Sequence, residues 1–129
     1  MRATLFAYVA TAFMSAGAAL AAPQLVMVEQ PGCAYCAAWN KAIAPIYPKT
    51  PEGQYAPLVR AQIKDGPPEG MTYARRVLFT PTFILIDDGQ ELDRIEGYPG
   101  EDFFWGLLGK MLEKHSGFTL SEGATGLSN

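Results

Sequence analysis

The sequence predicts a single α/β domain, a three-layer sandwich with a mixed four-stranded sheet and helices on both faces. The chain has 129 residues, enough for one ordinary domain, and 49% of them are hydrophobic, enough for a buried core. Short β-prone runs alternate with segments at helical spacing, and Pro and Gly clusters separate them. The expected order is strand, helix, strand, helix, strand, strand, helix.

The first two elements lie on either side of a tight turn. Residues 24–29 are apolar and β-prone, which predicts a buried strand, and Gln30-Pro31-Gly32 ends it. A helix is predicted over residues 34–44, and Pro45 and Pro48 stop it. Its apolar stripe recurs every four positions at Tyr35, Trp39 and Ile43.

The middle of the chain predicts a strand and a short helix. Residues 49–54 form a polar connection, and residues 56–63 form the second strand. A loop rich in Gly and Pro follows at residues 65–69. Met71, Ala74, Val77 and Leu78 recur at helical spacing, which predicts the second helix over residues 71–78.

The last three elements are a hairpin and a helix. Residues 82–86 are apolar on both faces, as in a central strand, and Asp88-Gly89 predicts a hairpin turn. The returning strand, residues 91–98, alternates imperfectly, which a bulge or an edge position would explain. The stripe of the final helix contains Phe104, Leu107, Leu108, Met111 and Leu112.

Both ends differ from the domain between them. After Arg2 the chain carries no charge up to Ala22, and Ala19-Leu20-Ala21 has the small-x-small pattern of a signal-peptidase site. We therefore expect a cleaved signal peptide at residues 1–21 and export to the periplasm, with a retained membrane anchor as the alternative. The predicted domain covers residues 22–115, and residues 116–129 are expected to form a flexible tail.

The charge pattern excludes one class of partner. The net charge is −3 and acidic and basic residues are interspersed, so no basic run suits nucleic acid. We expect a monomer that binds no nucleic acid.

Two cysteines, Cys33 and Cys36, stand three positions apart. A disulfide across so short a loop constrains the unfolded chain only slightly, so a reactive pair explains them better than a structural one. A helix N-terminus favours a thiolate, which is the nucleophile in disulfide exchange. We therefore assign Cys33 as the attacking nucleophile and Cys36, one turn later, as the resolving thiol.

Other uses of this spacing fit less well. Haem attachment requires a histidine after the second cysteine, where Ala37 stands. A zinc site needs about four ligands, and the only histidine is the distant His115. A copper carrier would draw on Met27 or Met71, which fit core positions better. We expect no metal and no cofactor.

The stretch Pro31-Gly32-Cys33-Ala34-Tyr35-Cys36, followed by Thr80-Pro81-Thr82-Phe83 at the start of a strand, resembles the thioredoxin superfamily over residues 24–114. The resemblance implies a thioredoxin-like sandwich in which Pro81 is cis and supports the cysteines. It implies that Thr80 presents its backbone to an extended substrate segment. Tyr35 is a candidate substrate contact, with a purely flanking position as the alternative.

The stretch from Glu29 to Trp39 is similar to periplasmic SoxS/SoxW-type thioredoxin-like proteins of bacterial sulfur-oxidation systems. That similarity implies a protein-disulfide reductase that acts on a sulfur-carrier protein and receives electrons from a membrane thiol donor. Thioredoxins have a buried Asp where this chain has Met27. Glu29 is the nearest acid, either a proton acceptor for Cys36 or an exposed strand end.

Two alternatives remain from the sequence. An exported glutaredoxin-like enzyme would also carry Cys-x-Tyr-Cys. A non-enzymatic protein, either a redox-sensing regulator or a metal carrier, would use the pair for binding alone.

Overall fold

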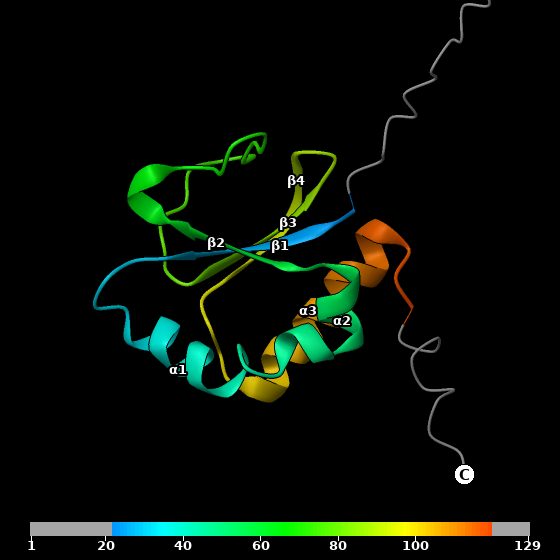
Figure 1. Cartoon of the computed structure of the whole chain (residues 1–129), viewed down its shortest axis with the longest axis horizontal. Helices are drawn as coiled ribbons and strands as arrows, with labels where there is room; N and C mark the ends of the chain where they lie inside the picture. The colour runs from blue at the N-terminus through cyan, green and yellow to red at the C-terminus, as the bar shows by residue number, and fades with distance from the viewer. Residues whose placement is uncertain (1–21, 120–129) are drawn as a thin grey trace, which may run out of the picture.

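A computed structural model describes residues 22–119, which form a mixed four-stranded sheet with strand order β2-β1-β3-β4 (Figure 1). β1 pairs in parallel with β2 and antiparallel with β3, and β3 pairs antiparallel with β4. The predicted fold class and all four predicted strands are confirmed. The strands are β1 (Gln24–Glu29), β2 (Leu58–Gln62), β3 (Thr82–Asp87) and β4 (Gln90–Glu96).

The three α-helices all lie on one face of the sheet (Figure 1). They are α1 (Ala34–Ala42), α2 (Pro51–Tyr55) and α3 (Glu101–Ser116), with short 3-10 turns η1 (Tyr47–Lys49) and η2 (Ile63–Asp65). Alternate residues of β1 and β3 point toward the helices because side chains alternate between the two faces of a strand. Those on the helical face are Leu25, Met27, Phe83 and Leu85.

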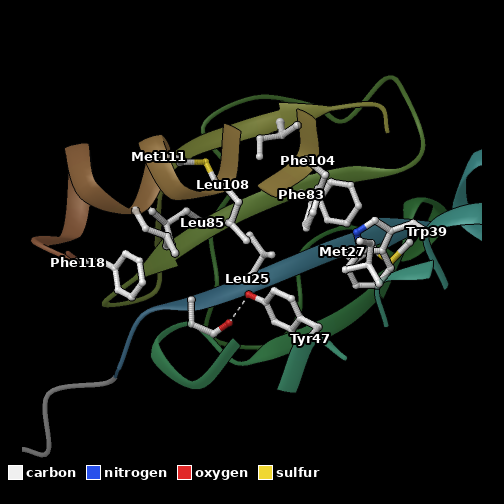
Figure 2. Close-up of a cluster of buried hydrophobic side chains, with 14 of the residues drawn as sticks. Leu25, Met27, Trp39, Tyr47, Phe83, Leu85, Phe104, Leu108, Met111 and Phe118 are labelled. Atoms are coloured by element: carbon white, nitrogen blue, oxygen red, sulfur yellow. Dashed lines mark hydrogen bonds between the residues drawn. The ribbon is translucent and has the colours of Figure 1, made fainter. Parts of the chain in front are cut away.

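Trp39 fixes α1 to the sheet. It is completely buried, and its ring centroid lies 5.1 Å from that of Phe83 and 5.7 Å from that of Phe104 (Figure 2). Aromatic pairs at such distances stabilise a core beyond the area they bury. Because Trp39 lies one turn after Cys36, this packing also sets the position of the helix end that carries the cysteines.

A short helix stands where the sequence predicted a polar connection. Thr50 caps α2 by accepting a hydrogen bond from the backbone N–H of Gly53 at 3.0 Å, and Pro51 occupies the first turn. Gly53 is required because a Cβ there would lie 1.8 Å from the carbonyl oxygen of Tyr47. The prediction of a connection over residues 49–54 was therefore wrong from Pro51 onward.

The predicted helix over residues 71–78 is absent. This stretch is irregular, and it covers the second face of the sheet with Met71, Tyr73 and Val77, which pack on Val26, Val28, Ile84 and Ile86. The sandwich therefore stands, but this face lacks the α-helix predicted for it. It is covered by the irregular segment and by Ile63 of the 3-10 turn η2.

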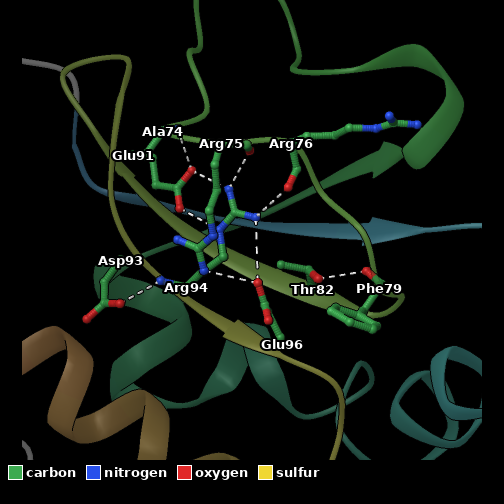
Figure 3. A network of polar contacts seen from close by, with 9 residues as sticks. All are labelled: Ala74, Arg75, Arg76, Phe79, Thr82, Glu91, Asp93, Arg94 and Glu96. Carbon is green, nitrogen blue, oxygen red and sulfur yellow. Dashed lines mark hydrogen bonds and ion pairs between the residues drawn. The ribbon is translucent and has the colours of Figure 1, made fainter.

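A buried ion pair on β4 holds that segment (Figure 3). Arg94 and Glu91 are each 2% exposed and meet in two contacts of 2.6 and 2.7 Å. Arg94 also donates to the carbonyl oxygen of Arg75 at 2.8 Å, and Glu91 accepts from the backbone N–H of Ala74 at 2.7 Å. These hydrogen bonds satisfy backbone groups that a helix would have satisfied internally.

A bulge explains the imperfect alternation of the returning strand. Leu85 pairs with Asp93 and Ile86 pairs with Glu91, so Leu92 is the extra residue. β4 is also an edge strand. Both explanations offered by the sequence therefore apply.

The C-terminal part is ordered beyond the predicted boundary at residue 116. Ser116 is the last residue of α3, and Phe118 is buried against the ring of Tyr55 at a centroid distance of 5.0 Å. The predicted signal peptide and residues 120–129 lie outside the described residues. Within residues 22–119, no helix has the length and apolar character needed to cross a bilayer.

Candidate active site

Cys33 and Cys36 form a disulfide at the start of α1. Their Cα atoms lie 5.2 Å apart, and Cys33 is the N-cap residue of the helix. The two differ in accessibility, since Cys33 is half-buried whereas Cys36 is only 3% exposed. A reacting partner can therefore reach the sulfur of Cys33 more readily than that of Cys36.

The helix N-terminus provides a hydrogen-bond donor to the sulfur of Cys33. The backbone N–H of Cys36 donates to the sulfur of Cys33 at 3.1 Å, and the first turn contains no acidic residue. Unpaired N–H groups and the positive end of the helix dipole stabilise a negative charge at this position. No carboxylate in the first turn repels a negative charge on the sulfur of Cys33.

Thr80 and Pro81 lie beside the loop that precedes the cysteines. The Thr80–Pro81 peptide bond is cis, and Pro81 is buried. The side-chain amide of Gln30 donates a hydrogen bond to the hydroxyl of Thr80 at 2.8 Å. This contact joins the segment before β3 to the segment before α1.

Glu29 belongs to a polar network next to Cys36. One carboxylate oxygen accepts a hydrogen bond from Asn40 at 3.0 Å, and the other pairs with Arg60 at 2.7 Å. Arg60 also donates to the side-chain oxygen of Asn40 at 2.9 Å. The Glu29 side chain is 15% exposed, so it is not the exposed strand end that one interpretation suggested.

Glu29, Asn40 and both cysteines line one shallow hollow of about 390 Å³. The structure therefore brings Glu29 and Cys36 to the same hollow. Tyr35 lies between the two cysteines in sequence, and its side chain points outward and is 66% exposed.

Three residues of this site were missed by the sequence reasoning: Gln30, Asn40 and Arg60. Asn40 had a local signal because it follows Cys36 by one helical turn and so lies on the same side of α1. Arg60 comes from β2, where it pairs with Met27 across the sheet, and no local pattern connects it with the cysteines.

The two methionines considered for a copper carrier lie on opposite faces of the sheet. Met27 is completely buried in the same core as Cys36, which agrees with the core position predicted for it, whereas Met71 packs against the other face. In the part of the chain from residue 22 to 119, no three His, Cys, Asp or Glu side chains are grouped so as to hold a metal ion.

Comparison with known proteins identifies the fold and the chemistry. The family described as "Thioredoxin-like domain" matches residues 14–112. The crystal structure of the periplasmic thioredoxin SoxS from Paracoccus pantotrophus, in its reduced form, is 52% identical. The match covers 71% of this chain and 97% of that chain, with a TM-score of 0.69.

A more distant structure, Trxlp from Edwardsiella tarda, is 21% identical and shares the fold, with a TM-score of 0.51. That match covers 67% of this chain and 82% of the other. Among curated proteins, none matches the chain. The family match, the similarity to SoxS and the Cys33–Cys36 disulfide at a helix N-terminus together establish that the chain belongs to the thioredoxin-like family and is a thiol–disulfide oxidoreductase.

Proposed function

We propose that the protein is a periplasmic protein-disulfide reductase in which Cys33 attacks and Cys36 resolves. The single observation that carries this assignment of roles is the difference in burial between the two sulfurs. An attacking thiolate must meet the disulfide of another protein, whereas a resolving thiol needs to reach only Cys33. The half-buried residue at the helix N-cap suits the first role, and the buried residue suits the second.

The reaction has two exchange steps. The Cys33 thiolate attacks one sulfur of the substrate disulfide, which forms a mixed disulfide and releases the other substrate sulfur as a thiolate. Cys36 then loses its proton and attacks the sulfur of Cys33, which releases the second substrate thiol and forms the Cys33–Cys36 disulfide. The substrate gains two electrons, and the protein must receive two from a thiol donor before the next cycle.

We propose that Glu29 accepts the proton that Cys36 loses in the second exchange step. Glu29 lines the same hollow as Cys36, and contacts with Arg60 and Asn40 hold its carboxylate in place. A base near the resolving thiol would raise the fraction of thiolate available for the second step.

We assign substrate positioning to Tyr35, Thr80 and Pro81. Thr80 and Pro81 directly precede β3, and an extended substrate segment would pair with the backbone of Thr80 there. The hydrogen bond from Gln30 fixes the Thr80 side chain. The exposed ring of Tyr35 offers an apolar surface next to Cys36 and Cys33.

The proposed location and partners rest on the N-terminal pattern and on the similarity to a periplasmic thioredoxin. Residues 1–21 would direct export and be removed. A membrane thiol donor would return the protein to its dithiol state, and a sulfur-carrier protein of the sulfur-oxidation system would be the substrate. We propose that the mature protein acts as a monomer.

Trapping variants test the roles of the two cysteines. Cys36→Ser should accumulate a mixed disulfide with the substrate in the periplasm, and mass spectrometry of the adduct should identify a sulfur-carrier protein. Cys33→Ser is the matched control and should capture nothing. A mixed disulfide formed through Cys36 in the Cys33→Ser variant would reverse the assignment.

A second experiment separates this function from a glutaredoxin-like one. Turnover of a protein disulfide should require a dithiol donor and should not be restored by glutathione alone. Activity with glutathione as the sole reductant would assign the protein to the glutaredoxin-like alternative.

A further inference from the structure

An apolar surface extends from the cysteine pair along α3. Large hydrophobic side chains are exposed there, at 66% for Tyr35, 70% for Phe103 and 43% for Leu107. One hollow of about 640 Å³ is lined by Tyr35, the segment 96–99 and Leu107. A second hollow of about 220 Å³ is lined by Asp102, Phe103, Gly106, Leu107 and Lys110. Leu107 lines both hollows, and we call the surface around them the α3 groove.

Gly106 shapes the floor of the α3 groove. It lies within α3, where glycine is among the poorest helix formers. No heavy atom lies within 4 Å of where its Cβ would be, so packing inside the domain does not require glycine. Its missing side chain leaves space between Phe103, Leu107 and Lys110 on the solvent side of the helix.

The edge of the groove is mostly acidic. Asp102 lines it, and Glu101 precedes it in the first turn of α3. Burial raises the pKa of the Tyr98 hydroxyl, and the negative charge of Glu101 raises it further. Among the lining residues, Asp102 borders one hollow and Glu96 the other, against the single cation Lys110, and this excess of acidic groups favours a basic group on an occupant.

We propose that the α3 groove binds an apolar side chain of the oxidised protein substrate, located a few residues from its reacting cysteine and next to a basic residue. This inference rests on the proposed function, because the substrate must place its disulfide over Cys33. The position of the groove next to the cysteine pair favours this occupant. Tyr35, which lies between the two cysteines in sequence, lines one end of the groove. A side chain seated at Leu107 and Gly106 would thus belong to the molecule whose sulfur is attacked.

Short peptides with a central cysteine, activated as its mixed disulfide with 2-thiopyridine, test the proposal. In a Ser/Gly background, a single leucine is moved through the positions on either side of the cysteine. The release of 2-thiopyridone measures the rate of attack by the reduced protein. The rate with 2,2′-dipyridyl disulfide, which has no peptide to occupy the groove, is the internal reference for every variant.

Leucine at one position should raise the rate relative to the reference by about tenfold, which corresponds to about 1.4 kcal/mol. A lysine beside that leucine should give a faster reaction than a glutamate there. Gly106→Gln, which fills the groove, and Leu107→Ser, which removes its apolar wall, should reduce the leucine effect to less than about twofold. Gly106→Ala is the matched control, because it makes the same backbone change with only a methyl group and should retain the preference.

The proposal is overturned if no leucine position accelerates the reaction, or if Gly106→Gln and Leu107→Ser both keep the full preference. Failure of the proposed function gives a different result. In that case the reference reaction itself would be no faster than that of ordinary free cysteine.

Discussion

The side-chain amide of Gln30 and the hydroxyl of Thr80 form a hydrogen bond of 2.8 Å between residues 50 positions apart in sequence. Gln30 lies in the turn that leads to Cys33, and Thr80 precedes the cis Pro81. The bond therefore connects the nucleophile's loop with the segment assigned to substrate positioning.

A double-mutant cycle on Gln30 and Thr80 should show coupling in protein-disulfide turnover. Gln30→Ala and Thr80→Ala should each lower kcat/KM severalfold, and the double variant should be little slower than either single one. The expected coupling is about 0.5–1.5 kcal/mol, the usual contribution of a hydrogen bond. Purely additive effects would mean that the contact does not order the site.

Glu29→Gln should slow the second exchange step by roughly a hundredfold, the lower end of what general acid–base groups contribute. The measurement is the release of substrate from a preformed mixed disulfide at Cys33, followed after rapid mixing and acid quenching. Asn40→Ala is the control, because it removes a donor to Glu29 while keeping the carboxylate. Equal slowing in both variants would show that the polar network only supports the structure, and it would contradict the proposal that Glu29 accepts the proton.

Arg94→Met should destabilise the domain by about 3–5 kcal/mol, since it leaves the buried Glu91 carboxylate without its partner. Arg75→Met is the matched substitution, because Arg75 also pairs with a glutamate but is 61% exposed. Its cost should stay below about 1 kcal/mol. Urea unfolding of both variants measures the difference, and similar midpoints for the two would contradict it.

Tyr47 should make stability fall at alkaline pH. Burial, with a smaller contribution from Glu52, raises the pKa of Tyr47 in the folded protein, and its hydroxyl donates to the carbonyl oxygen of Ala56 at 2.7 Å. In the unfolded chain this hydroxyl loses its proton near pH ~10, so the stabilisation is complete below that pH and is lost above it.

Tyr47→Phe tests this by removing the titrating group. The variant should lose about 1 kcal/mol at neutral pH with the hydrogen bond, and its free energy of unfolding should decline less steeply above pH ~10. Chemical denaturation across that range provides the measurement. An unchanged alkaline slope would show that other groups cause the decline.

The sequence predicted the cysteine pair and the strands because their signals are local. The two sulfurs are three positions apart, and residues 82–86 have an unbroken β-prone run that became β3. The cis state of Pro81 followed from the family resemblance, and the structure agrees. Arg60 could not be predicted, because it reaches Glu29 from a neighbouring strand.

The helix predicted over residues 71–78 failed because tertiary contacts replaced its internal hydrogen bonds. Thr72 donates its N–H to Gly89 and accepts from Glu91, which pairs it with β4. Glu91 and Arg94 then bind the backbone of the next residues. Apolar spacing alone does not reveal a buried ion pair contributed by another strand.

The missed α2 helix had a readable signal. Thr50 is a favoured N-cap residue, and Pro51 follows it in the first turn. Proline is favourable there because a backbone N–H at that position would have no partner within the helix. A five-residue helix is too short to show apolar periodicity, so residues 49–54 have the pattern of a polar connection.

The packing of Phe118 on Tyr55 sets the minimal length for recombinant production of the domain. The Tyr55 hydroxyl also donates to the carbonyl oxygen of Ser116, so two contacts attach the end of α3 and the residues after it to α2. Shortened versions that stop at Lys114 would leave the Tyr55 ring without its cover and favour aggregation. Shortened versions should therefore retain Phe118.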